Sequence, residues 1–265
     1  MIDFHLHSKF SHDGHQKLNT IIETAAAKGF THIAVTDHCD WDYLFLKGYW
    51  YERQIKLKKY LKTLKAIAAD SPISVAVGIE LGYHALATKK YLSEMPFDEL
   101  DYVINSAHSA DGDDAYFPSF FRKKERDYAY KLYLDAVEES LEAPYPYCTI
   151  SHIGYVAKNA PYENPVFLYS DHAEQLDRIL KRIIELDKTL EINSNIKVQN
   201  FMPHESIVER YVELGGKKVI FGSDAHRTPR IGEGYKEAET LVKSLGISEW
   251  AIYKNLEPVT VKIPD

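Results

Sequence analysis

The chain has 265 residues, of which 45% are hydrophobic and 27% are charged, and this composition excludes a disordered chain. The formal net charge of -7 and the lack of a long lysine and arginine run argue against nucleic acid as an obligate partner. No apolar stretch of about 18 residues and no signal peptide are apparent, so we expect a cytoplasmic protein that neither spans nor requires a membrane. The only cysteines, Cys39 and Cys148, fit a reducing compartment.

Short β-branched segments alternate with amphipathic segments along the chain, which predicts successive βα units around a parallel sheet. Seven strands are expected, at 2–6, 32–36, 73–78, 102–106, 147–151, 190–193 and 219–222. Helices are expected at 17–28, 51–69 and 123–141, then from an Asp171 N-cap, from Pro203 to the Gly215 stop, and at 236–244. An α/β barrel of this length commonly forms a single domain.

Six histidines and three acids fall at or just beyond the C-terminal ends of these strands. They are His5, His7, Asp13, His38, Glu80, His108, His152, Asp224 and His226. Parallel strands of a βα barrel deliver their following loops to one rim, where active sites are built. Any one of these histidines could be a buried side chain bonded to backbone, but that interpretation explains the full set poorly. The pattern therefore predicts a multinuclear metal site.

The donor types indicate which ions such a site would hold. The two imidazoles of a His-x-His segment within a strand point to the same face, which suits chelation of one ion. A carboxylate such as Glu80 can bind a different ion through each oxygen. Mixed nitrogen and oxygen ligands are those that zinc, manganese and iron accept. We expect two to three divalent ions of these kinds.

Six short motifs in this sequence resemble those of the PHP family, named for polymerase and histidinol phosphatase. They are HLH at 5–7, TDH at 36–38, GIE at 78–80, SAH at 106–108, SHIG at 151–154 and SDAH at 223–226, in family order. The resemblance implies one domain over 1–265 with a distorted (β/α)7 TIM-like barrel. It also implies a trinuclear site, with a first metal on His5, His7, Glu80 and Asp224, a second on Glu80, His108 and His152, and a third on His38 and His226 with a ligand from the first loop.

The first loop departs from the family pattern. Many relatives place a histidine six residues after the second histidine of the His-x-His motif, whereas this chain has Asp13 there, between His12 and His15. The spacing favours Asp13 as the remaining ligand, with His12 as the alternative. Asp37 is expected to hydrogen-bond a ligand imidazole or the strand end.

For a stand-alone chain of this length, the resemblance implies hydrolysis of L-histidinol phosphate in histidine biosynthesis. The expected reaction is attack on phosphorus by a hydroxide that bridges two ions. Glu80, Asp224 and His226 are the expected catalytic residues, and Asp224, His226 or a metal-bound water would supply the proton to the leaving group. Lys158, Lys197, Arg227 and Arg230 follow strand ends and are the expected phosphate contacts, while Asp111 and Asp113 are expected to receive the cationic aminoalcohol.

Other functions remain open at this point. A nucleotide or oligonucleotide phosphatase of the same family should show a basic groove, of which this acidic chain offers little. A metal-dependent amidohydrolase would be expected to carry a bridging lysine where this chain has Glu80. A non-catalytic, metal-stabilised interaction module is the alternative from another class, and the apparently complete ligand set argues against it.

Overall fold

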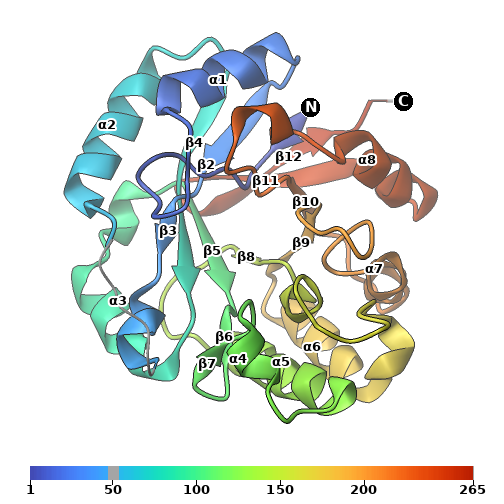
Figure 1. Ribbon diagram of the computed structural model, residues 1–265. Helices are drawn as coiled ribbons and strands as arrows, with labels where there is room; N and C mark the ends of the chain where they lie inside the picture. Colours follow the sequence, from blue (N-terminus) through green and yellow to red (C-terminus); the bar gives the residue numbers. More distant parts are fainter. Residues whose placement is uncertain (47–53, 265) are drawn as a thin grey trace.

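The computed structural model describes residues 1–46 and 54–264, and seven parallel strands form its centre (Figure 1). Their order in the sheet is β1-β2-β4-β5-β8-β9-β10. The strands are β1 (Ile2–Asp3), β2 (His32–Val35), β4 (Ser74–Gly82), β5 (Tyr102–Ser106), β8 (Thr149–Ile150), β9 (Thr189–Asn193) and β10 (Val219–Gly222). All seven positions were predicted, although several strand ends differ.

The sheet closes on itself through its first and last strands. The Phe4 N–H donates to the Phe221 carbonyl at 2.9 Å, and Leu6 pairs in parallel with Ala225. Two strands, β1 and β8, have only two residues each, which makes the ring irregular. The expected distorted (β/α)7 barrel is therefore confirmed.

Helices surround the ring on its outer side (Figure 1). They are α1 (Leu18–Ala27), α2 (Leu57–Ala69), α3 (Thr88–Glu94), α4 (Pro118–Phe121), α5 (Arg126–Ser140), α6 (Ala173–Glu185), α7 (Glu205–Glu213) and α8 (Tyr235–Ser244). In α6 the buried side chains Leu176, Ile179, Leu180 and Ile183 recur at helical spacing, so one stripe packs inward. None of the helices in the described ranges is long and apolar enough to cross a bilayer.

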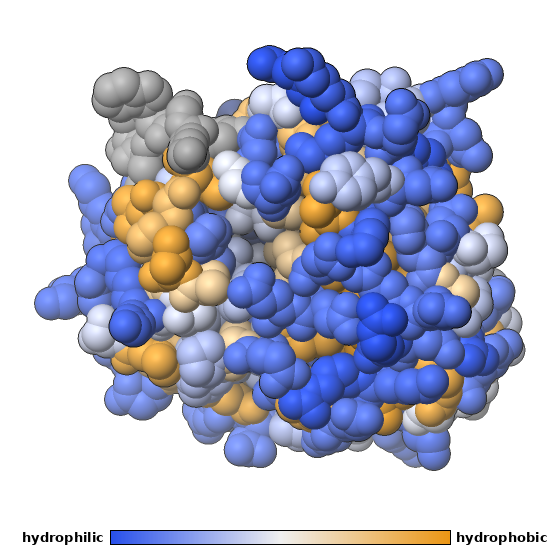
Figure 2. All heavy atoms as spheres, turned by 90° about the horizontal axis from the view of Figure 1, so that it is seen from below, coloured by the Kyte–Doolittle hydropathy of each residue, from blue (hydrophilic) through white to orange (hydrophobic). Residues whose placement is uncertain are grey.

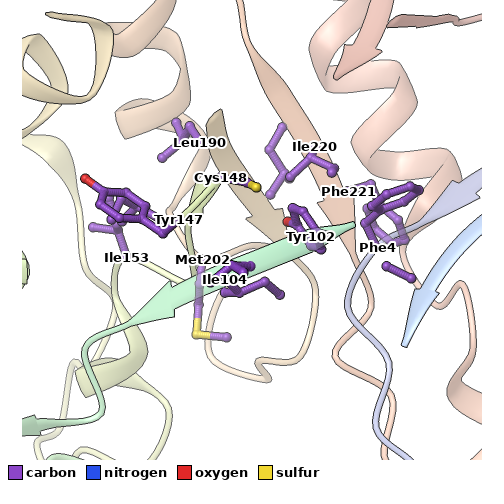
Figure 3. Packing of buried hydrophobic residues seen from close by; sticks show 14 of the residues in the cluster. Phe4, Tyr102, Ile104, Tyr147, Cys148, Ile153, Leu190, Met202, Ile220 and Phe221 are labelled. Atoms are coloured by element: carbon purple, nitrogen blue, oxygen red, sulfur yellow. The ribbon is translucent and has the colours of Figure 1, made fainter. Parts of the chain in front are cut away.

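Buried hydrophobic side chains from successive strands pack together in one core (Figure 3). Phe4 packs edge-on against Tyr102 with ring centroids 5.4 Å apart, and both are buried with Ile104, Leu190 and Phe221. Cys148 lies in this core, and Cys39 is also buried and free. Hydrophilic side chains predominate on the face that Figure 2 presents, with hydrophobic ones in smaller patches.

A C-terminal hairpin that the sequence did not predict covers one end of the barrel. Its strands are β11 (Glu249–Lys254) and β12 (Glu257–Lys262). The Tyr253 ring stacks on Tyr102 at 5.4 Å, and its hydroxyl lies 2.7 Å from that of Thr189. Both partners are the first residues of their strands, so the hairpin closes the N-terminal end of the barrel and leaves the C-terminal end open.

Several predicted boundaries were wrong for local physical reasons. Strand β4 continues to Gly82 because its last residues pair with β5 and with a short strand, β3 (His38–Cys39), so Glu80 lies within the strand. Helix α2 begins at Leu57, and positions 51–53 of the expected helix lie outside the described residues. Asp171 does not cap α6, because its carboxylate accepts from the Leu168 N–H and from Arg126. Helix α3 was not predicted from the sequence.

Candidate metal centre

A cavity of about 520 Å³ opens at the C-terminal ends of the barrel strands. Seven of the nine predicted ligands line it, namely Asp13, His38, Glu80, His108, His152, Asp224 and His226. The other two, His5 and His7, are fully buried and contact Glu80 and Asp224. The barrel thus brings all nine side chains together from segments more than 200 residues apart in sequence.

One face of Glu80 meets a first cluster, formed by His5, His7 and Asp224. Glu80 Oε2 lies 3.1 Å from His5 Nε2 and 3.5 Å from His7 Nε2. His7 Nε2 also lies 3.1 Å from Asp224 Oδ1. His5, His7 and Glu80 each have a ligand atom within 4.8 Å of the others, so they could hold one ion.

The other face of Glu80 meets a second cluster, formed by His108 and His152. Glu80 Oε1 lies 3.2 Å from His108 Nε2 and 3.1 Å from His152 Nε2, and the two ring nitrogens are 3.3 Å apart. Because its two oxygens face different clusters, Glu80 has the geometry of a bridging carboxylate.

The residues expected at a third position form a looser group. Asp13 Oδ2 lies 3.0 Å from His226 Nε2 and 3.8 Å from His38 Nε2. Of the two alternatives in the first loop, Asp13 thus points between these rings. The His12 side chain is 46% exposed, and its Nε2 lies 4.0 Å from Asp13 Oδ2.

The electrostatic environment gives His7, Glu80 and Asp224 the charge states that cation binding requires. Although burial alone would lower the pKa values of His5, His38 and His108, the neighbouring carboxylates raise them, so an ion that binds these three imidazoles takes the place of a proton. Burial lowers the pKa of His7 to about 3, helped by the neighbouring His226 and His38, so this imidazole is neutral at pH 7. Burial alone would raise the pKa of Glu80, but His38 and His5 hold it well below its usual range. Burial alone would also raise the pKa of Asp224, but Lys158 and His5 hold it well below its usual range. Neutral imidazole and ionised carboxylate are the forms that bind metals.

Several donor atoms of the site are buried without a hydrogen-bond partner among the described residues. They include His7 Nε2, His38 Nδ1 and Asp40 Oδ1. A buried polar atom without a partner is costly, and a coordinated cation is one way to satisfy it. The mixed imidazole and carboxylate donor set is also the one that zinc, manganese and iron accept. The residues present therefore fit divalent metal ions.

Asp37 holds the loop that follows the first strand. Its carboxylate accepts from the Ser8 N–H at 2.7 Å and from the Ser11 N–H at 2.9 Å, as well as from both hydroxyls. Ser11 Oγ in turn lies 3.3 Å from His7 Nδ1 and accepts from the His38 N–H at 2.9 Å. Asp37 thus acts on the strand end, one of its two expected roles, and reaches the imidazole only through Ser11.

Two acids that contact the predicted ligand imidazoles were not predicted. Asp40 Oδ2 lies 3.4 Å from His38 Nδ1, and its other oxygen lies 3.7 Å from His108 Nδ1. Glu191 is buried on β9 and contacts His5. A charged residue in the middle of the buried strand segment LEIN was a usable signal for Glu191, since an acid is rarely buried without partners. The proximity of Asp40 to His38 in TDHCD was the signal for Asp40.

Cationic side chains line the cavity on the loops that follow β8, β9 and β10. They are Lys158, Lys197, Arg227 and Arg230. Lys158 Nζ lies 3.6 Å from Asp224 Oδ2, and Arg230 donates to Asn195 Oδ1 at 2.8 Å. The expected phosphate contacts are thus placed around one cavity.

The expectation for Asp111 and Asp113 requires correction, because neither lines the cavity. Asp111 lies in the turn between β6 (Ser109–Ala110) and β7 (Asp113–Asp114), where its side chain is 52% exposed and pairs with Lys124 at 3.2 Å, and Asp113 is the first residue of β7. The hairpin instead directs the next acid, Asp114, to the cavity wall. The alternation of side chains along a strand explains why Asp113 and Asp114 face differently.

Comparison with known proteins identifies the family. The PHP domain family model matches residues 3–195, which is more than half of the chain. The chain belongs to the PHP family. The matched range ends before β10, which in this PHP protein is followed by Asp224 and His226.

The PHP protein is also similar, over nearly the full length of both chains, to other proteins. It is 28% identical to a probable histidinol-phosphatase of Clostridium acetobutylicum, covering 97% of this chain and 98% of that one. It is 26% identical to the histidinol-phosphatase of Lactococcus lactis, covering 97% and 95%. The crystal structure of the Lactococcus lactis histidinol phosphate phosphatase, complexed with zinc, L-histidinol and phosphate, matches with a TM-score of 0.87 and 25% identity over 97% of this chain and 98% of that one.

Proposed function

We propose that this PHP protein is a metal-dependent phosphatase that hydrolyses L-histidinol phosphate to L-histidinol and phosphate. The observation that carries the proposal is the convergence of nine imidazole and carboxylate side chains, with Glu80 at their centre, at the mouth of the barrel. The similarity over nearly the full length to a histidinol phosphate phosphatase whose structure holds zinc, L-histidinol and phosphate supports the substrate.

We assign the metal ligands as two clusters joined by Glu80 and a third position. His5, His7, Asp224 and Glu80 would hold the first ion, and Glu80, His108 and His152 the second. His38 and His226 would hold a third with Asp13. Two to three bound ions of zinc, manganese or iron would lower the pKa of a water molecule and neutralise the phosphoryl oxygens.

The cationic side chains around the cavity would bind the phosphoryl group. Lys158, Lys197 and Arg227 can each donate to its oxygens, whose charge is spread over three atoms during transfer. Lysine acts as a point charge in this role, whereas arginine can bind two oxygens at once. Asp224 and His226 are the titratable side chains that we propose for passing a proton to the leaving alkoxide.

An acidic and aromatic group faces the cavity from another set of elements, and we propose that it receives the cationic aminoalcohol. Asp114 is 1% exposed, accepts from the Tyr43 hydroxyl, and accepts from the Tyr116 N–H at 2.7 Å. Burial raises the pKa of Asp114 above its usual value, and a cation at this position would offset that effect. Tyr116 and Phe117 offer aromatic surface beside it.

Replacing Lys158 with alanine should raise the KM for phosphate esters or lower kcat. A hydrogen bond to a charged group contributes about 1.5–3 kcal/mol, so kcat/KM should fall roughly 10- to 150-fold. Steady-state kinetics with L-histidinol phosphate and an aryl phosphate measures this, and Lys158→Arg should recover much of the loss. If neither parameter moves in Lys158→Ala, this lysine does not bind phosphate.

Replacing Asp114 with asparagine should impair L-histidinol phosphate more than an aryl phosphate, because only the former carries a cationic amine. We expect kcat/KM for L-histidinol phosphate to fall by about 10-fold or more relative to the aryl ester. Asp111→Asn is the matched control, since it makes the same chemical change in the same hairpin outside the cavity. Equal losses for both substrates would remove Asp114 from amine recognition.

The substrate itself is tested by phosphate release from L-histidinol phosphate, nucleotides and an aryl phosphate, with elemental analysis of the same preparation. We expect the highest kcat/KM for L-histidinol phosphate and at least two divalent ions per chain. A higher kcat/KM for nucleotides would refute the proposed substrate and support the other phosphatase function.

A further inference from the structure

Glu191 is a buried acid that contacts one ligand residue from each of the two clusters around Glu80. It lies on β9 with 1% of its side chain exposed. Its Oε1 is 2.5 Å from His5 Nδ1, and its Oε2 accepts from the backbone N–H of His152 at 2.8 Å. Asn193 also donates its side-chain amide to Oε2, at 3.2 Å. The carboxylate therefore connects β1 with the loop after β8.

The contact with His5 selects which ring nitrogen carries a proton. A carboxylate can only accept, so His5 Nδ1 must be the donor in this contact. His5 Nε2, on the other side of the ring, lies 3.1 Å from Glu80 Oε2 in the first cluster. Because Glu191 holds a proton on Nδ1, Nε2 is the ring nitrogen left to bind an ion, and an ion there would take the place of a proton shared with Glu80 Oε2.

The contact with His152 holds an unfavourable backbone conformation. His152 has a φ of 28°, a value that side chains with a Cβ rarely adopt and that persists where the surroundings enforce it. Its N–H is held by Glu191, and its carbonyl accepts from the Tyr155 N–H at 2.8 Å. This conformation places His152 Nε2 at 3.1 Å from Glu80 Oε1 in the second cluster.

We propose that Glu191 is a positioning residue that keeps His5 and His152, one imidazole from each cluster, in the form that binds an ion. This inference rests on the metal sites of the proposed function. It adds Glu191 as a residue outside the ligand set that hydrogen-bonds two of the ligand residues. It also makes the two clusters interdependent, because a single carboxylate supports both in addition to the shared Glu80.

The isosteric change Glu191→Gln tests the proposal because both main partners are donors. A glutamine amide has one oxygen, so it can accept from His5 Nδ1 or from the His152 N–H but not fully serve both. In either orientation its NH2 group faces a donor, and one ligand loses its position or its tautomer. Loss of a partner behind a metal ligand costs about 10- to 100-fold in metal affinity, and we expect Glu191→Gln to weaken zinc binding by this factor.

Zinc affinity is measured by competition with a chromophoric chelator, independently of turnover. Glu142→Gln is the matched control, because the Glu142 carboxylate also accepts from two N–H groups, but these belong to Arg182 and the Glu142 side chain is 59% exposed. Glu191→Asp keeps two acceptor oxygens and should bind zinc more tightly than Glu191→Gln. Zinc affinity of Glu191→Gln equal to that of the wild type and of Glu142→Gln would overturn the proposal.

A measurement on the wild type covers the case in which Glu191→Gln does not fold. In the zinc-loaded protein, long-range proton–nitrogen NMR should show the His5 proton on Nδ1, assigned by the loss of its signals in His5→Asn. A proton on Nε2 would overturn the proposal. Wild-type protein that binds zinc but releases no phosphate from L-histidinol phosphate would refute the proposed substrate, and the zinc affinities would still decide the role of Glu191.

Discussion

Replacing Glu80 with alanine should lower kcat for phosphate ester hydrolysis by more than about 100-fold. Loss of a residue that only hydrogen-bonds a metal ligand already lowers metal affinity or activity about 10- to 100-fold. Glu80 is itself a proposed ligand, shared by two ions. It contacts His5, His7 and His38 through Oε2 and His108 and His152 through Oε1. Steady-state kinetics together with metal analysis measures the effect, and we expect fewer bound ions per chain.

The control separates loss of a ligand from loss of the fold. Glu80→Gln has the same shape but lacks the negative charge that balances the surrounding imidazoles, so it should also lose metal while circular dichroism stays close to that of the wild type. Removing one partner of a buried charged network can destabilise a protein by about 3–5 kcal/mol, which makes this check necessary. Near-normal turnover of Glu80→Ala with a full metal content would contradict the bridging assignment.

The sequence predicted the parts of the fold in which local pattern and tertiary packing agree. All seven barrel strands were located because buried parallel strands appear as short β-branched runs. The end of β4 was missed because Glu80 and Leu81 continue the strand through pairing with β3, a contact that no local pattern reveals. The hairpin of β11 and β12 was missed because its position depends on the contact between Tyr253 and Tyr102, which are distant in sequence.

The residues of the site also divide into those that the sequence predicted and those that it did not. Residues in motifs at strand ends, such as His108 and His152, could be placed because the barrel topology dictates where strand ends meet. Asp111 and Asp113 were predicted to face the cavity and Asp114 was not, because the sequence of an acidic loop does not show which way each side chain points. Glu191 was missed because its partners, His5 and the His152 backbone, become neighbours only when the ring closes.

Removing divalent ions with a chelator should abolish hydrolysis and lower the thermal stability of the protein. Removal of a single group that stabilises the transition state costs about 10²- to 10³-fold in kcat, so loss of all proposed ions should cost at least about 10³-fold. Ions bound at 100 times their Kd stabilise the folded state by about 2.7 kcal/mol, which corresponds to about 5–10 °C in Tm for a chain of this size.

The expected fall in Tm has a structural cause in the donor atoms that lack other partners. Without ions, His7 Nε2, His38 Nδ1 and Asp40 Oδ1 remain buried without hydrogen bonds from described residues. Turnover and Tm are measured before chelation, after dialysis, and after addition of zinc, manganese or iron(II). Glu80→Ala serves as the control, since chelation should change its Tm less. Full turnover at less than one bound ion per chain would contradict metal dependence, whereas recovery of both turnover and Tm with one ion would identify the metal that this centre prefers.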